Sequence, residues 1–283
     1  MIDIETFVSR ASSIYSKATL KRKLKVLKMY DKFLEKNNLE PGLDSLAKWM
    51  DSLRGKVSDQ SLGIYVRDII SYFDIMLMDV DERKLKAIKK MIPRISFKQP
   101  DVLTAEEVRR LIEVSEYPYK LIFALAFAYA RRLNEVLSCE VDLEKNKIVF
   151  PILKRRKEEF VEFEIEPWIM EMIEEYIRIN KKASQKRLFK ISDRAVEIAF
   201  KRYCEKIGIN TKKRRITFHS LRHSIISILV ERGVPIEIIG KVLARHVSIS
   251  TTYQFYTSPT KGMMEKIPKV QDILFQATAE KNQ

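Results

Sequence analysis

Apolar side chains recur at helical spacing, and at no other spacing, throughout residues 1–94 of the chain. The clearest run follows steps of four and three residues, which keep its members on one face of a helix. Its members are Leu62, Val66, Ile69, Phe73 and Met76. We therefore predict a purely helical first part, with helices over residues 19–34, 44–53, 59–78 and 81–90.

A stretch without any hydrophobic period separates this part from the rest of the chain. Residues 91–100 (MIPRISFKQP) hold two prolines, and such a stretch is typical of a linker. We place the domain boundary here, with an all-helical domain over residues 1–95 and a second domain over residues 96–283.

The second domain mixes helices with two short strands. Thr104 followed by Glu107 has the spacing of a capping box, which predicts the start of a helix. Two predicted strands, over residues 147–150 and 159–165, are joined by the basic turn Lys154–Lys157. Further helices are expected over residues 121–130, 168–180 and 192–207. The predicted fold class is therefore mainly α with a small antiparallel β-sheet.

Composition excludes several classes of protein. Hydrophobic residues make up 46% of the chain, which is ordinary for a packed globular protein. No apolar run reaches the roughly 18 residues of a membrane helix, and the N-terminal MIDIETFVSR lacks the apolar core of a signal peptide. The two cysteines, Cys139 and Cys204, are too few for a disulfide framework or a four-cysteine zinc site. We expect a cytoplasmic protein with no membrane partner.

The charge balance indicates a polyanionic partner. The chain carries 53 Lys and Arg against 38 Asp and Glu, a net charge of +15. Both predicted domains are basic, as expected if both contact the same polyanion, and nucleic acid fits better than a membrane. The plainer alternative is a lysine-rich surface that only keeps the protein soluble.

All histidines of the chain lie close together near its C-terminal end, at His219, His223 and His246. His219 and His223 have the spacing of two metal ligands on a helix, but no glutamate lies between them and Arg222 would repel a cation. Satisfied core histidines are a second possibility. The third is an anion site, because His219 and Arg222 lie one helical turn apart and both donate hydrogen bonds that suit a phosphate.

The motifs around these residues resemble those of the tyrosine recombinases, the phage integrase family. HSLRH at His219–His223 is similar to the family's HxLRH box, and ARRLNEVLS at residues 130–138 to its GLRxxELLxL helix. The resemblance places the first catalytic arginine at Arg132, the second at Arg222, and a buried acid at Glu135. KRRKEEFVEF at residues 154–163 is similar to the family's β-hairpin turn, which implies Lys154 as the catalytic lysine and Lys157 as the runner-up.

Two departures from the family pattern leave the register of the last motifs open. The family's Leu-Gly-His is Leu-Ala-Arg-His here, so either Arg245 or His246 takes the place of the histidine, and we favour His246. The family's tyrosine lies nine residues after that histidine, where this chain has Phe255. We take Tyr256 as the nucleophile, with Tyr253 as the rival; packing beside Phe255 is the alternative for either ring.

The resemblance implies a site-specific DNA recombinase. It would clamp double-stranded DNA between a helical core-binding domain and an α+β catalytic domain, and would cleave and rejoin strands through a 3′-phosphotyrosyl intermediate as a homo-tetramer. No metal, ATP or other cofactor is implied. Glu135 is expected to orient a basic neighbour rather than to contact DNA. The basic run Lys212–Arg215 is a further candidate for phosphate contacts, or else a plain solvated loop.

Several functions remain open within and beside that class. The chain is either a Xer-like resolvase of chromosome dimers or an integrase of an archaeal virus or plasmid. An inactive DNA-binding protein of the same fold is the alternative from another class, and a metal-dependent nuclease is a third hypothesis. The sequence specifies neither the target site nor an accessory protein. It also leaves open whether the amphipathic tail beyond Pro268 packs on its own domain or on a neighbouring protomer.

Overall fold

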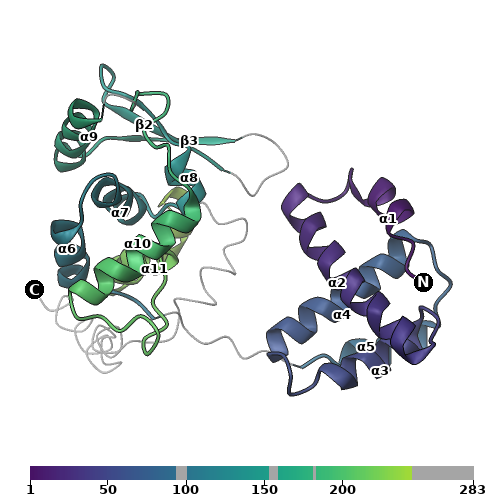
Figure 1. The fold of residues 1–283 in the computed structure, drawn as a ribbon. Coiled ribbons are helices and arrows are strands. Elements are labelled where there is room, and N and C mark those ends of the chain that lie inside the picture. The colour runs from purple at the N-terminus through teal and green to yellow at the C-terminus, as the bar shows by residue number, and fades with distance from the viewer. Residues whose placement is uncertain (94–100, 153–158, 181–182, 244–283) are drawn as a thin grey trace, which may run out of the picture. The chain divides into compact units, whose positions relative to one another are not determined.

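The computed structural model describes residues 1–93, 101–152, 159–180 and 183–243 (Figure 1). The chain divides into two compact units, Met1–Ser96 and Phe97–Gln283, and each unit has a core of its own. The predicted fold class, mainly helical with a small antiparallel sheet, is confirmed. Within the described ranges, no helix is long and apolar enough to cross a membrane.

The first unit consists of helices. They are α1 (Ile4–Ala11), α2 (Lys17–Asn37), α3 (Leu43–Leu53), α4 (Asp59–Ile75) and α5 (Glu82–Met91). Side-chain oxygens of Asp3, Ser16, Ser58 and Asp81 accept hydrogen bonds from the first-turn amides of four of them, which fixes where those helices begin. The sequence did not predict α1. It also extended α4 to Met78, whereas Leu77 takes a φ of 55° there, outside the helical region.

A buried ion cluster joins α2 to α4. The Nζ atom of Lys23 lies 3.0 Å from Oδ1 of Asp68, and Arg22 reaches Oδ2 of the same carboxylate at 2.5 Å. Lys23 and Asp68 are only 5% and 3% exposed. The Lys23 ammonium also lies 4.6 Å from the centre of the Tyr15 ring, which adds a cation–π contact. The buried ammonium of Lys23 and the buried carboxylate of Asp68 therefore both have partners, and Arg22 reaches the carboxylate from the surface.

The second unit is built around one apolar helix. Its elements are α6 (Ala105–Val114), α7 (Tyr119–Ala128), α8 (Leu133–Leu137), β1 (Glu140–Asp142), β2 (Lys147–Pro151), β3 (Phe160–Glu164), α9 (Pro167–Ile179), α10 (Asp193–Lys206), α11 (His219–Glu231), α12 (Ile236–Ile238) and the π-helix η1 (Ile239–Leu243). Residues 121–126 of α7 are fully buried. Figure 1 shows α7 among the other helices of the unit, and it packs against α6, α8, α9, α10 and α11.

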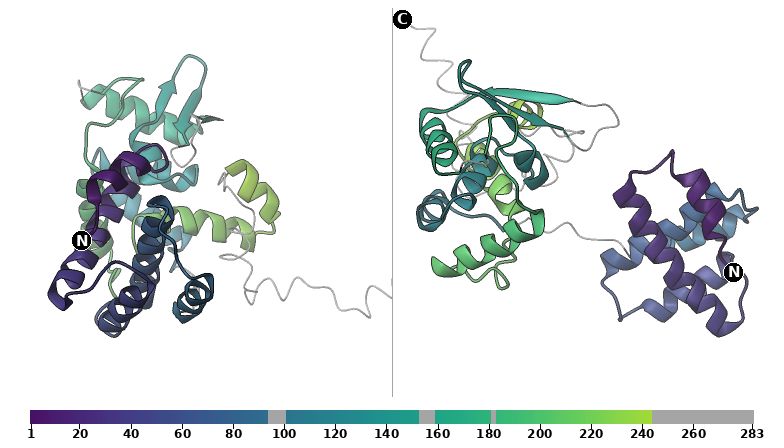
Figure 2. Two further views of the ribbon diagram at one scale, coloured as in Figure 1. Left: turned by 90° about the vertical axis from the view of Figure 1, so that its right-hand side faces the viewer. Right: turned by 45° about the horizontal axis from the view of Figure 1, so that its top comes forward.

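The sheet has the strand order β1-β2-β3, with both pairs antiparallel. Ile148 faces Phe163 and Phe150 faces Val161 across β2 and β3, and alternate residues of β2 are buried against the core. The predicted pair of strands is thus confirmed, whereas β1 was not predicted. In Figures 1 and 2, α9 lies next to the sheet, and its buried Ile169 and Ile173 belong to the same core. The turn Lys154–Lys157 lies outside the described residues.

Candidate active site

The chain reverses direction in a tight turn between α7 and α8. Ala130 has a φ of 49°, in the left-handed region that side chains other than glycine rarely adopt. Its methyl group is fully buried beside Ile226, Val230 and Ile239, so packing compensates for the unusual backbone. The amide of Arg131 donates to the carbonyl of Ala126 at 3.1 Å, which closes the turn.

Glu135 holds Arg132 by its main chain and by its side chain. Oε2 of Glu135 accepts from the Arg132 amide at 3.0 Å, and Oε1 accepts from Nη1 at 2.7 Å. The carboxylate is 1% exposed, whereas the Arg132 side chain is 23% exposed. One end of the guanidinium is thus held by a buried acid while part of its surface remains open. The prediction that Glu135 orients a basic neighbour is confirmed.

Arg222 approaches the same turn from α11. Its Nη1 atom donates to the carbonyl oxygen of Ala130 at 2.5 Å, two residues before Arg132. Arg222 is only 1% exposed, so this contact holds a buried charge in place. The sequence pattern predicts that Arg222 donates to a phosphate, which stays a prediction; in the structure one of its donors fixes the turn that carries Arg132.

His219 is the first residue of α11 and its side chain is exposed. It borders a hollow of about 240 Å³ that Leu133, next to Arg132, and Lys201 of α10 also line. Three of the predicted site residues, Arg132, His219 and Arg222, are therefore gathered around the α7–α8 turn and the start of α11. Such a cluster of donors is suited to an anion.

His223 packs against His219 but differs from it in environment. The two rings lie edge to face with their centres 4.6 Å apart. Burial, and then the neighbouring charge of Arg222, lower the pKa of His223 to about 4, so its ring is neutral at pH 7. Within the described ranges, no three His, Cys, Asp or Glu side chains are grouped so that they could hold a metal ion.

Arg131 is a residue of the site that sequence reasoning missed. Its guanidinium is buried against one ring from each hairpin strand and the end of η1: Nε donates to Tyr129 O at 2.7 Å, and Nη2 donates to Leu243 O. The rings of Phe150 and Phe163 lie 5.9 and 5.4 Å from its guanidinium carbon. The only signal was an arginine where the family pattern has leucine. Arg131 thus connects the hairpin, the turn and η1.

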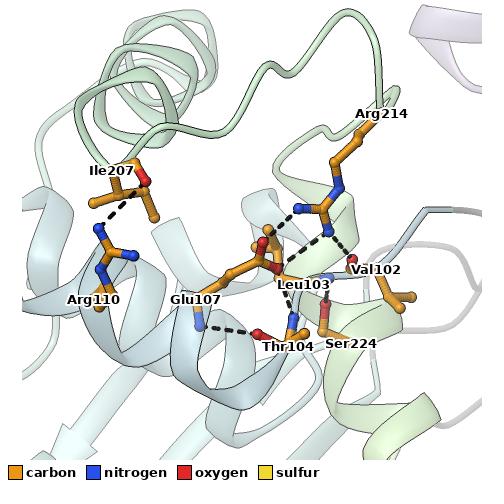
Figure 3. Close-up of polar contacts among 8 residues, drawn as sticks. All are labelled: Val102, Leu103, Thr104, Glu107, Arg110, Ile207, Arg214 and Ser224. Atoms are coloured by element: carbon orange, nitrogen blue, oxygen red, sulfur yellow. Dashed lines mark hydrogen bonds and ion pairs between the residues drawn. The ribbon is translucent and has the colours of Figure 1, made fainter.

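The start of the second unit is fastened to α11, as Figure 3 shows. Oγ of Ser224 accepts from the Leu103 amide at 2.7 Å. Arg214 binds both oxygens of Glu107, at 2.5 and 3.2 Å, and donates to the Val102 carbonyl at 2.7 Å. These contacts fix the segment that leads into α11.

The contacts of Glu107 bear on two predictions, the capping box with Thr104 and the role of the basic run Lys212–Arg215. Glu107 and Thr104 form the predicted capping box, which is confirmed. The hydrogen bond from Arg214, above all, holds the pKa of Glu107 below its usual value, so the pair is ionised at neutral pH. Arg214 is therefore engaged within the protein, whereas Lys212, Lys213 and Arg215 of the same basic run are exposed.

The remaining predicted site residues lie outside the described part of the chain. They are Lys154 with its runner-up Lys157, His246 with its rival Arg245, and Tyr256 with its rival Tyr253. Their assignments stay predictions. The described residues lead toward them: β2 and β3 carry the hairpin that bears Lys154, and η1 ends at Leu243, three residues before His246.

The first unit carries a separate basic surface on α2. Lysines at steps of four or three residues share one face of this helix and are exposed: Lys17, Lys21, Lys25, Lys28 and Lys32. They border a groove of about 580 Å³ whose floor includes Leu20, Leu24 and Met29. At about 1.5 Å of rise per residue, the lysine row extends over roughly 20 Å. Such a row of point charges is suited to an extended polyanion.

Comparisons with known proteins agree on one family. Residues 101–263 match the phage integrase family. The chain is 29% identical to tyrosine recombinase XerA of Pyrococcus horikoshii over 86% of each protein, and 31% identical to tyrosine recombinase XerA of Thermococcus kodakarensis over 74% of each. The fold resembles that of the Tn1549 transposon integrase in complex with a circular intermediate DNA, with a TM-score of 0.69, 12% identity, and coverage of 93% of this chain and 99% of that chain.

Proposed function

The chain belongs to the phage integrase family, and we propose on this premise that it is a site-specific tyrosine recombinase of double-stranded DNA. It would cleave and rejoin strands through a 3′-phosphotyrosyl intermediate. The observation that carries the proposal is the hydrogen bond from Arg222 to Ala130, because it brings the two arginines expected for the family to one turn. The Xer recombinases among the relatives support the same activity.

The arginines act on the charge that develops at phosphorus. A phosphodiester carries one delocalised negative charge, which concentrates on the equatorial oxygens when a nucleophile attacks. Arg132 meets this charge with the exposed part of its guanidinium, while Glu135 keeps the other part in place. Donors that are already oriented need no rearrangement during the reaction, and one such donor accounts for a factor of about 100 to 1,000 in rate. His219 adds a further donor at the edge of the same cluster.

The bond-making groups come from the predicted residues. The hydroxyl of Tyr256 attacks phosphorus, the phosphorus bond to the 5′-oxygen breaks, and the DNA 3′-phosphate becomes esterified to the tyrosine. A tyrosine hydroxyl has a pKa of about 10, so nearby guanidinium charge favours the phenolate that attacks. Lys154 protonates the leaving 5′-oxygen, and His246 donates to the phosphate. The ester conserves the energy of the broken bond, so a second 5′-hydroxyl can displace the tyrosine without ATP.

Assembly on DNA uses both units. We assign the core-binding role to the helical residues 1–95 and catalysis to residues 96–283. The exposed lysine row of α2 supports a backbone contact by the first unit. Four copies would exchange strands in a synaptic complex in the cytoplasm. The XerA relatives favour a Xer-like resolvase, and the departures at His246 and Tyr256 favour a virus or plasmid integrase; flanking DNA that contains a site would support the latter.

A covalent adduct tests the proposal. We would incubate the full chain, with chelator present, on a nicked duplex made from the DNA that flanks its gene. The wild type, Tyr256→Phe and Tyr253→Phe would be compared on a denaturing gel. An adduct that is lost only in Tyr256→Phe is the expected result. Loss only in Tyr253→Phe would keep the activity and correct the nucleophile.

The same gel separates the other two functions. Binding of the duplex without any adduct would favour an inactive DNA-binding protein of this fold, which the shifted tyrosine alone supports. Cleavage that disappears in chelator would favour a metal-dependent nuclease. The recombinase is expected to form the same amount of adduct with and without chelator, because the nucleophile that breaks the strand is a tyrosine hydroxyl rather than a metal-bound water.

A further inference from the structure

Besides the hollow beside His219, a basic hollow lies at the end of α8 that is far from Arg132. It has a volume of about 710 Å³, and its lining includes Ser138, which follows α8, and the basic residues Lys186, Arg187 and Lys190. All three basic side chains are exposed, and none of them forms an ion pair with a described residue. Three positive charges that converge on a polar hollow without an acidic partner are a candidate anion site.

The segment that carries these charges is held firmly. The main chains of Ser184 and Arg187 bond each other at 3.2 and 3.0 Å, which closes a tight turn. Gln185 fixes this turn to β1, because its carbonyl accepts from the Val141 amide at 2.8 Å and its side-chain oxygen accepts from Leu143.

Burial anchors the same segment on its other side. Leu188 and Phe189 are 1% and 3% exposed, and the Phe189 ring stacks on Tyr176 with centres 5.6 Å apart. The main chain under the three charges is therefore ordered before any ligand arrives. A preformed site loses less conformational entropy when it binds than a free loop would.

The position of the hollow suggests what it binds. Arg132 and Ser138 are six positions apart, and at about 1.5 Å of rise per position they lie roughly 9 Å apart along α8. One strand of a duplex advances about 3.4 Å per nucleotide, so this span corresponds to two or three nucleotides. We propose that the hollow binds a backbone phosphate of the DNA a few nucleotides from the phosphate that is cleaved. This inference rests on the proposed function.

The three charges would hold the duplex without reading its sequence. The lysines supply flexible point charges, and the guanidinium of Arg187 can donate two parallel hydrogen bonds. Both kinds of side chain contact phosphate oxygens equally well at any base pair. Binding would release counterions, so each phosphate contact adds to the salt dependence of affinity. The contribution of the hollow should therefore be visible on DNA of any sequence.

The salt dependence of binding tests the proposal. Affinity of the full chain for a fluorescent random-sequence duplex would be measured over about 50 to 300 mM salt. The test variant carries Lys186→Gln, Arg187→Gln and Lys190→Gln. The matched control carries Arg109→Gln, Lys145→Gln and Lys147→Gln, which removes the same charge from residues already paired with acids. The test variant should lower the slope of log Kd against log salt by about 0.9, which is the contribution of one phosphate, and the control should keep a slope close to that of the wild type.

The other outcomes overturn the inference in distinguishable ways. A test variant with the slope of the wild type or of the control means that the hollow does not contact DNA. If inorganic phosphate at matched ionic strength raises the Tm of the wild type but not of the test variant, and the DNA slope stays unchanged, the hollow is a small-anion site instead. Failure of the wild type to bind any duplex would refute the proposed function, and this inference with it.

Discussion

The guanidinium of Arg222 donates a hydrogen bond to the carbonyl oxygen of Ala130, and this contact of 2.5 Å joins residues 92 positions apart in the chain. It makes α11, which also begins with His219, a support for the turn that carries Arg132. The site is therefore assembled around one strained turn. Changes to that turn should affect catalysis more strongly than DNA binding.

Ala130 is the most direct place to perturb the turn. Its φ of 49° costs a side chain about 1 to 2 kcal/mol, whereas burial of its methyl group contributes about 0.8 kcal/mol. We expect Ala130→Gly to change the free energy of unfolding by no more than about 1 kcal/mol and to keep adduct formation. Ala130→Val should lower stability and cleavage because a β-branched side chain disfavours this backbone. Denaturant unfolding and the adduct gel measure both effects; a fully active and stable Ala130→Val would contradict the strain argument.

Glu135 should control catalysis through Arg132. In Glu135→Gln the side-chain oxygen can still accept one of the two bonds to Arg132, whereas Glu135→Ala leaves the guanidinium unheld. Single-turnover cleavage is expected to decrease in the order wild type, Glu135→Gln, Glu135→Ala, with about a 100-fold loss for the alanine variant. Affinity for the duplex should change less than threefold. A parallel loss of affinity would instead indicate that Glu135 supports the fold of the whole DNA surface.

His223 predicts a pH dependence of stability. Its pKa in the folded protein is about 4, below the value of about 6.5 that an unfolded chain would have. Between these values the unfolded state binds more protons, so this residue's contribution is complete above about pH 6.5 and decreases as the pH falls toward 4. In this pH range the free energy of unfolding should therefore change less with pH in His223→Gln than in the wild type. The difference between the two slopes should reach up to about 1.4 kcal/mol per pH unit. Urea unfolding of both proteins between about pH 5 and pH 8 measures the difference, and identical slopes would contradict the assigned burial effect.

In the ion cluster of the first unit, removal of one charge should destabilise the protein more than removal of both. Asp68→Ala leaves the buried Lys23 ammonium without its acid, which should cost about 3 to 5 kcal/mol. Replacing both residues, as Lys23→Met with Asp68→Leu, removes the charges together and should cost much less. Thermal unfolding of the full chain, monitored by circular dichroism, would compare the two. Equal destabilisation would mean that shape rather than charge holds α2 to α4.

Much of the fold follows from local patterns that the sequence displays openly. The capping box of Thr104 and Glu107 marked the start of α6, and the apolar residues within 159–165 marked β3. β1 could not be found in this way, because three residues are too few to display a period. α1 was missed because eight residues near a chain end display only about two helical turns.

The candidate site was predictable where motif residues carry it, and not where tertiary contacts do. The spacing of Arg132 and Glu135 implied their pairing, which an i, i+3 contact on a helix permits. Arg131 gave no such signal, because its partners Tyr129, Leu243 and the hairpin rings come from three separate segments. Arg214 belongs to a basic run that predicted either phosphate contacts or a solvated loop, and its bonds to Glu107 join positions far apart in the sequence.

Strand joining distinguishes a recombinase from an enzyme that only cleaves DNA. The full chain would be given a nicked duplex with a fluorescent strand upstream of the cleavage site and a second strand that offers a free 5′-hydroxyl, with chelator present and ATP absent. We expect a longer fluorescent strand, formed by transfer of the cleaved 3′ end from the tyrosine to the new hydroxyl, and we expect its loss in Tyr256→Phe. Fluorescent strands that are shortened and carry a free 3′ end, with no joined product and no adduct, would show hydrolysis and contradict this expectation.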